Sequence, residues 1–154
     1  MAIRKIVTLG DDTLRKHCKV QEKFDRRLAV LLKDMADTMY KAEGVGLAAP
    51  QVGVLRRLFV VDVGEGPVVL VNPEILETSG EQTGSEGCLS IPGRSAEVTR
   101  PDFVRVRGLD ENGREVEYEA KELFARAILH EYDHLEGVLY TDKVDPSEVV
   151  AEEE

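Results

Sequence analysis

The chain has 154 residues, of which 42% are hydrophobic, and its formal net charge is −10. This length suits one domain with one core, and no apolar run is long enough for a transmembrane helix, so we exclude a membrane association through a spanning segment. The chain has only two cysteines, and its start is too short and charged for a signal peptide. We therefore expect a protein of the reducing cytoplasm.

The first predicted element is a helix over residues 25–43. Its apolar residues recur at helical spacing, which predicts one face packed on the core. These residues are Leu28, Leu31, Leu32, Met35, Met39 and Ala42. Gly44 follows where a glycine would cap the helix end.

The next segment, residues 44–51, reads Gly-Val-Gly-Leu-Ala-Ala-Pro-Gln. Gly44 and Gly46 would let the backbone approach a ligand closely, and the two alanines would keep a cavity wall small. An ordinary loop after a helix explains the same residues. The segment alone leaves both interpretations open.

Two short runs that are rich in β-branched residues predict strands over residues 58–63 and 68–72. Two more are predicted over residues 103–109 and 114–118, joined at Asn112-Gly113 as a hairpin. Alternation in this hairpin predicts one apolar face and one face crossed by opposite charges. Between the strand pairs lies Cys88, in a glycine-containing segment over residues 85–93.

The last predicted helix covers residues 119–136 and is expected to end at Gly137. It carries His130-Glu131-Tyr132-Asp133-His134, and a spacing of four places both imidazoles on one helix face. Two such histidines can bind one metal ion, with Glu131 as the general base of a hydrolase. A surface helix can also carry this pattern by chance.

The third ligand distinguishes the classes of metal site. A metzincin would have a histidine where this chain has Tyr140, and a thermolysin-like site would need a glutamate from the end of the chain. Upstream, Cys88 is a plausible ligand, and a Cys/His/His set leaves a fourth tetrahedral position open. Such a set suits Zn²⁺, Fe²⁺, Co²⁺ or Ni²⁺.

Three motifs together resemble the signatures of peptide deformylases, in the same order and at similar separations. They are residues 44–51, residues 86–90 (Glu-Gly-Cys-Leu-Ser) and residues 130–134. The resemblance covers about Ile3 to Tyr140. One departure is Leu129, where the family usually has glutamine before the first histidine; this position is not a ligand.

The resemblance implies an α+β single domain, with antiparallel or mixed sheets packed around a central C-terminal helix that carries the metal motif. It implies that Cys88, His130 and His134 bind one divalent metal, Fe²⁺ in the cell, with Zn²⁺, Ni²⁺ or Co²⁺ possible in the isolated protein. A water or hydroxide on the metal would then attack the formyl carbon of an N-formylmethionyl nascent peptide. Glu131 would act as general acid and base, and formate would be released.

Further roles follow from the same resemblance or from helix spacing. The Gln51 amide and the Leu89 backbone N–H would hold the oxyanion. Glu86 and Asp133 would orient the ligands, with Asp133 pairing with Arg100 or lying solvated on the helix face. The substrate would contact Gly44, Val45, Gly46, Glu86, Gly87, Leu123, Arg126 and Ala127. Among these, we expect Arg126 to extend outward over the pocket rim.

We divide the chain into a catalytic domain, residues 1–145, and a short acidic tail, residues 146–154, expected to be solvated and disordered. Some deformylases use a basic C-terminal helix to dock on the ribosome. This acidic tail predicts only transient ribosome contact and no direct binding of nucleic acid. We expect a monomer. The rival interpretations are a metallopeptidase and a catalytically silent metal-binding protein of the same fold.

Overall fold

The computed structural model describes residues 2–151. Its two α-helices are α1 (Arg26–Lys41) and α2 (Glu122–Leu135). Its strands are β1 (Gly46–Ala48), β2 (Leu58–Val61), β3 (Val68–Ser79), β4 (Gln82–Cys88), β5 (Ile91–Arg100), β6 (Phe103–Leu109), β7 (Glu115–Lys121) and β8 (Val150–Ala151). Short 3-10 helices are η1 (Asp12–Arg15), η2 (Ala49–Val52), η3 (Tyr140–Lys143) and η4 (Pro146–Glu148).

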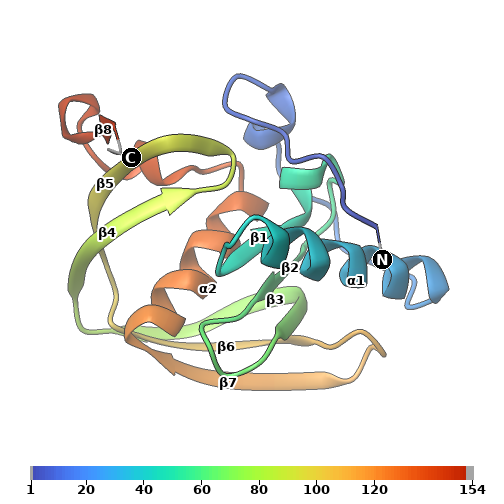
Figure 1. Ribbon diagram of the computed structural model, residues 1–154. Coiled ribbons are helices and arrows are strands. Elements are labelled where there is room, and N and C mark those ends of the chain that lie inside the picture. Colours follow the sequence, from blue (N-terminus) through green and yellow to red (C-terminus); the bar gives the residue numbers. More distant parts are fainter. Residues whose placement is uncertain (1, 152–154) are drawn as a thin grey trace.

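The strands form two antiparallel sheets. One has five strands in the order β1-β2-β3-β6-β7, and the other has three in the order β4-β5-β8. The helix α2 runs between the two sheets (Figure 1). This arrangement confirms the predicted α+β domain with a central C-terminal helix that carries both histidines.

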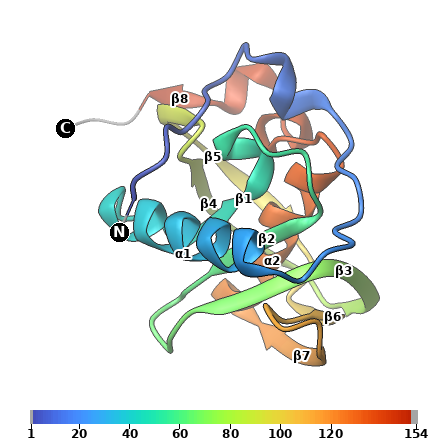
Figure 2. The same ribbon diagram turned by 90° about the vertical axis from the view of Figure 1, so that its right-hand side faces the viewer.

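The five-stranded sheet is buried on both faces near β2, because one helix covers each side (Figure 2). Phe59 and Val61 pack in the cluster that contains Ala127 and Ile128 of α2. The alternate residues Leu58 and Val60 pack in the cluster that contains Leu31 and Met35 of α1. A strand covered on both sides needs apolar residues at every position, which explains the continuous run Leu-Phe-Val-Val.

The helix α1 begins at Arg26, after Asp25 caps it through a hydrogen bond from the Leu28 N–H. The predicted apolar face is buried except for Ala42, which is exposed. The prediction that Gly44 caps this helix is wrong: Glu43 takes the left-handed conformation, with φ of 59°. The Gly44 N–H then reaches back to the Met39 carbonyl, so the chain leaves the helix directly into β1.

The helix α2 begins at Glu122, three residues later than predicted, because β7 continues to Lys121. Lys121 pairs with Phe103, and the length of β6 thus determines where β7 ends. At the other end, the predicted C-terminal glycine is confirmed, since Gly137 has φ of 76° and follows the cap residue Glu136. This helix is therefore held by the sheet at its start and by a glycine at its end.

The predicted hairpin over β6 and β7 is confirmed, with Gly108 opposite Val116 and Leu109 opposite Glu115. On its charged face Arg105 contacts Glu117 at 3.7 Å, and Arg107 contacts Glu115 at 3.4 Å. The predicted strand over residues 68–72 is longer than expected and becomes β3. The strands β4 and β5 were not predicted.

The prediction of a disordered tail is wrong for residues 146–151. These residues form η4 and then β8, which pairs with Ser95 and Arg94 of β5. Val149 packs against the cluster around Ile91 and Tyr140. Residues 152–154 lie outside the described residues, and the domain boundary at residue 145 stays a prediction. Within residues 2–151, neither α1 nor α2 has the length and apolar composition of a membrane-crossing helix.

Candidate active site

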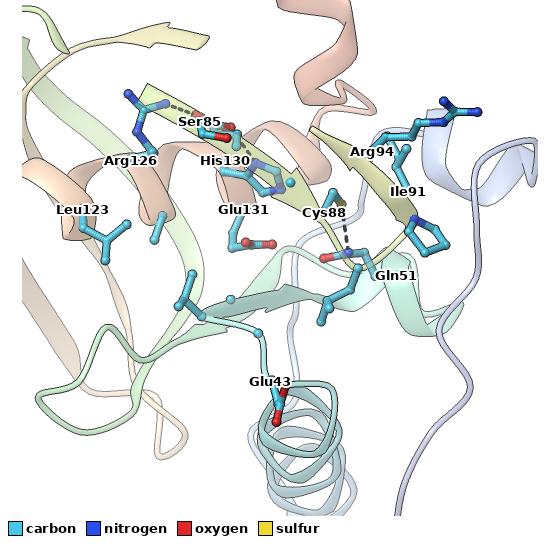
Figure 3. Close-up of a pocket in the computed structure, with 18 of the residues that line it drawn as sticks. Glu43, Gln51, Ser85, Cys88, Ile91, Arg94, Leu123, Arg126, His130 and Glu131 are labelled. Atoms are coloured by element: carbon cyan, nitrogen blue, oxygen red, sulfur yellow. Dashed lines mark hydrogen bonds and ion pairs between the residues drawn. The ribbon is translucent and has the colours of Figure 1, made fainter. Parts of the chain in front are cut away.

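A cleft of about 440 Å³ lies between β1, the turn that joins β4 to β5, and α2 (Figure 3). The predicted site residues meet here although they come from three distant segments. All of them except His134 line the cleft: Gly44, Val45, Gly46, Gln51, Glu86, Gly87, Cys88, Leu89, Leu123, Arg126, Ala127, His130 and Glu131. His134 is 1% exposed and lies beside Cys88.

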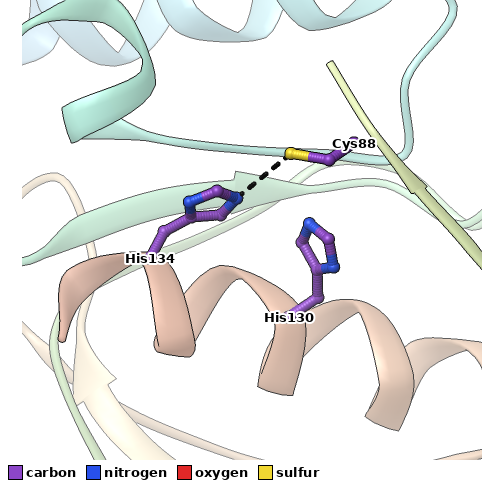
Figure 4. A group of neighbouring side chains, drawn as sticks. All are labelled: Cys88, His130 and His134. Carbon is purple, nitrogen blue, oxygen red and sulfur yellow. Dashed lines mark hydrogen bonds between the residues drawn. The ribbon is translucent and has the colours of Figure 1, made fainter. Parts of the chain in front are cut away.

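The side chains of Cys88, His130 and His134 converge on one point beside the cleft (Figure 4). Their ligand atoms all lie within 4.8 Å of one another, and the Cys88 Sγ is 3.4 Å from the His134 Nε2. Sulfur and nitrogen ligands of one tetrahedral ion are about 3.5 Å apart, given typical metal–ligand distances. One thiolate and two imidazoles at this spacing fit a divalent metal ion.

The carboxylate of Glu86 orients His130. The Nδ1 of His130 lies 2.9 Å from the Glu86 Oε1, which leaves Nε2 as the nitrogen available to a metal. Glu86 also accepts hydrogen bonds from Arg100, at 2.5 and 3.0 Å, and from Arg126, at 2.5 Å. Burial alone would raise the pKa of Glu86, but its bonds with His130 and Arg100 outweigh burial and hold this pKa at about 2.

The prediction that Arg126 extends outward over the pocket rim is wrong, because its side chain turns inward. It is 6% exposed, and its Nη1 donates to Glu86 and, at 3.0 Å, to the Val98 carbonyl. Gly84 leaves the space for it: a Cβ at that position would lie 3.3 Å from the Arg126 Nη2. The negative charge of Glu86 thus draws the guanidinium inward. The predicted pair of Asp133 and Arg100 is confirmed at 2.9 Å.

The carboxylate of Glu131 lies against β1. A Cβ on Gly46 would lie 2.9 Å from the Glu131 Cδ, so only glycine leaves room for this side chain. Glu131 is 4% exposed, and burial raises its pKa to about 7. Burial likewise holds the pKa of His134 well below its usual value. A buried carboxyl in this pKa range can exchange a proton with a neighbouring water near neutral pH.

Gln51 approaches the same point from η2. Its Oε1 accepts a hydrogen bond from the Ala48 N–H at 2.9 Å, so its NH₂ group faces Cys88. The Nε2 lies 3.5 Å from the Cys88 Sγ and 3.1 Å from the Ser90 Oγ. An amide donor held beside the candidate metal ligands can bind an oxygen that becomes negative during reaction.

Comparison with known proteins agrees with this geometry. The family model described as polypeptide deformylase matches residues 3–150. The chain belongs to the polypeptide deformylase family. Among curated deformylases, one from Clostridium botulinum (strain Alaska E43 / Type E3) is 60% identical over 143 residues, which are 93% of this chain and 97% of that protein.

Solved deformylase structures have the same fold. The one from Legionella pneumophila is 47% identical with a TM-score of 0.93, covering 96% of this chain and 89% of that one. The one from Synechococcus elongatus, in complex with actinonin, is 46% identical with a TM-score of 0.88, covering 91% of this chain and 78% of that one.

Several residues of this deformylase cleft were missed from sequence. Ile91, Pro92 and Arg94 line the cleft, and Ser90 contacts Gln51. The first three line the cleft because β4 and β5 pair as a hairpin. The sequence patterns did not predict this pairing. Ser90 stands inside a motif that was recognised, but nothing in the motif indicates which side chain its hydroxyl meets.

Proposed function

We propose that this chain is a metal-dependent hydrolase that removes the N-terminal formyl group from N-formylmethionyl nascent polypeptides and releases formate. One observation carries the proposal: in a chain of the deformylase family, Cys88, His130 and His134 converge beside a cleft that Glu131 and Gln51 also line. A chance histidine pattern on a surface helix would not place a thiol and a buried carboxylate at the same point.

Cys88, His130 and His134 would hold one divalent metal ion, and we propose Fe²⁺ in the cell, with Zn²⁺, Ni²⁺ or Co²⁺ possible after isolation. When bound, the ion supplies Lewis acidity and makes water more acidic. The buried Glu86, hydrogen-bonded to His130, keeps that imidazole oriented toward the ion.

Glu131 is proposed as the proton carrier. Its buried carboxylate accepts a proton from the attacking water and gives it to the departing amine, so one group serves as base and then as acid. Its place beside Gly46 keeps it at the cleft and next to the metal ligands.

Gln51 and Leu89 are proposed to stabilise the oxyanion. The Gln51 amide has its oxygen side held by Ala48, so its N–H groups can donate toward the cleft. The Leu89 backbone N–H lies in the turn that follows Cys88 and would be the second donor.

The remaining cleft residues are proposed to bind substrate. Gly44 and Gly46 let a peptide backbone approach closely, and the narrow wall they form would accept a formyl hydrogen but not an acetyl methyl group. The other proposed contacts form the walls of the same cleft: Val45, Glu86, Gly87, Leu123, Arg126 and Ala127. Since the Arg126 guanidinium turns toward Glu86, only its stem would meet a methionine side chain.

We propose a cytoplasmic monomer that contacts the ribosome only transiently, without a basic C-terminal helix and without binding nucleic acid directly. The acidic sequence of residues 145–154 supports this part of the proposal. Salt-sensitive co-sedimentation with ribosomes that is lost when residues 146–154 are removed would contradict it.

The test is formate release from formyl-Met-Ala-Ser by anaerobically purified protein. We expect release by the wild type and a loss of at least about a hundredfold in Glu131→Gln with its metal still bound. Glu122→Gln, an exposed change at the start of the same helix, serves as the matched control. No release after loading in turn with iron, nickel and zinc would favour the silent homologue, and cleavage of unformylated peptides would favour a metallopeptidase.

A further inference from the structure

Ser90 is completely buried, yet it lies outside the lining of the cleft. It comes two residues after Cys88, in the turn between β4 and β5. Its hydroxyl oxygen accepts a hydrogen bond from the Gln51 Nε2 at 3.1 Å. This buried hydroxyl is therefore hydrogen-bonded directly to the proposed oxyanion donor.

The contacts of Gln51 fix which way its amide faces. The Ala48 N–H can only donate, so the atom 2.9 Å from it must be the Gln51 oxygen. The NH₂ group has two hydrogens, and the Ser90 hydroxyl accepts one of them. The other hydrogen points toward the Cys88 Sγ, which lies 3.5 Å from the Gln51 Nε2. Two partners on opposite ends of the amide therefore prevent its rotation.

The backbone supports the same alignment. The Leu9 N–H donates to the Ser90 carbonyl at 2.8 Å, and the Val7 N–H donates to the Gln51 carbonyl at 2.8 Å. One short N-terminal segment thus binds both residues and sets their separation. The main chains that carry the hydroxyl and the amide are therefore anchored to the same segment, which favours a preorganised donor.

We propose that Ser90 is a positioning residue that holds the Gln51 amide in the orientation needed to stabilise the oxyanion. This inference rests on the proposed function, and on the proposed role of Gln51 in particular. Without the hydroxyl, one N–H of a buried amide loses its acceptor, and the amide can turn toward other partners. The donor is then in place for only part of the time, which lowers kcat and leaves substrate binding nearly unchanged.

The experiment is a double-mutant cycle on formate release. Ser90→Ala is expected to lower kcat about tenfold, with KM changed less than about twofold, because a donor is misplaced but not removed. In a Gln51→Ala background the same change is expected to have less than about a twofold effect, since no amide is left to position. Ser95→Ala, in the same hairpin and without a side-chain hydrogen bond among the described residues, is the matched control.

A metal content and melting temperature equal to those of the wild type show that Ser90→Ala still folds. An equal loss of kcat in both backgrounds would overturn the proposal, because Ser90 would then act on the Cys88 turn and not through Gln51. An unchanged kcat in Ser90→Ala would overturn it as well.

A second measurement separates this inference from the proposed function. In ¹⁵N-resolved NMR spectra, the Gln51 side-chain NH₂ is expected to show two well-separated, slowly exchanging protons in the wild type and faster exchange in Ser90→Ala. If the loaded wild type releases no formate but this change occurs, the positioning by Ser90 stands and the proposed function fails. Identical NH₂ spectra in both proteins would overturn the positioning itself.

Discussion

Gly46 is the residue that leaves room for the proposed proton carrier. A Cβ there would meet the Glu131 carboxylate, whose Cδ would be 2.9 Å away. We expect Gly46→Ala to displace this carboxylate and to lower kcat by about a hundredfold, the range for a lost general base. Steady-state kinetics on formyl-Met-Ala-Ser, with metal content and circular dichroism measured alongside, test this expectation.

Gly44→Ala is the matched control for this change. Its Cβ would meet the Leu89 Cδ1 at 2.8 Å, the far end of a side chain that can turn away. We therefore expect an effect mainly on KM and a change in kcat of only a few-fold. A wild-type kcat in Gly46→Ala would show that Glu131 does not work from the position it holds beside β1.

At this scale, sequence reasoning succeeded where the residues are close along one helix. The spacing of His130 and His134 fixes their common face, whatever the rest of the fold does. It failed for Arg126, because the rule that long cationic side chains extend to water does not foresee a buried Glu86 within reach. It also left Ser90 without a role, since its partner Gln51 is 39 residues away in the sequence.

At the scale of elements, the sequence predicted strands that have a continuous apolar run or a regular alternation, and it missed strands that contain several glycines. The strand β2 is a continuous apolar run, while β4 and β5 contain Gly84, Gly87, Pro92 and Gly93, which sequence rules assign to turns. These two strands form because they pair with each other over most of their length. This hairpin forms one wall of the cleft. Local sequence patterns therefore could not predict that wall.

The end of α2 offers a test of how elements are joined. Gly137 has φ of 76°, and a Cβ there would lie 2.6 Å from the Arg15 carbonyl oxygen. Gly137→Ala therefore combines an unfavourable backbone conformation with a clash against the last residue of η1. We expect it to lower the free energy of unfolding by more than about 2 kcal/mol, measured by urea denaturation.

Gly10→Ala separates the two contributions. Its φ of 103° is also unfavourable for alanine, but no atom lies within 4 Å of the added Cβ. We expect a loss of about 1 kcal/mol, the cost of the backbone conformation without the clash. Equal losses in the two variants would mean that α2 and the N-terminal segment separate at little cost.

At the scale of the whole molecule, segments near both termini are bound to distant parts of the chain. The strand β8 pairs with β5, and Arg15 of η1 pairs with Asp142 of η3, 127 residues later in the sequence. The acidic sequence alone suggested a solvated end, because charge indicates solvation but not backbone pairing. Val149, which begins a short apolar run between acidic residues, packs on the cluster beside Cys88 and accounts for the difference.

The pair of Arg15 and Asp142 makes stability depend on pH in a defined direction. The hydrogen bond from Arg15 lowers the pKa of Asp142 below its usual 3.8. A carboxyl whose pKa is lower in the folded state contributes stability above the unfolded value, and loses it as pH falls through the folded value. Both side chains are more than a third exposed, so the contribution at neutral pH is below about 1 kcal/mol.

We therefore expect Asp142→Asn to destabilise the protein by less than about 1 kcal/mol at pH 7 and to have no effect once the pH is well below 3.8. Urea denaturation at several pH values measures the difference from the wild type. Arg15→Gln removes the partner cation, and in that background the Asp142→Asn difference is expected to lose most of its pH dependence. A difference between Asp142→Asn and the wild type that is constant from pH 7 to pH 3 would instead assign its effect to the uncharged hydrogen bond with the Leu139 N–H.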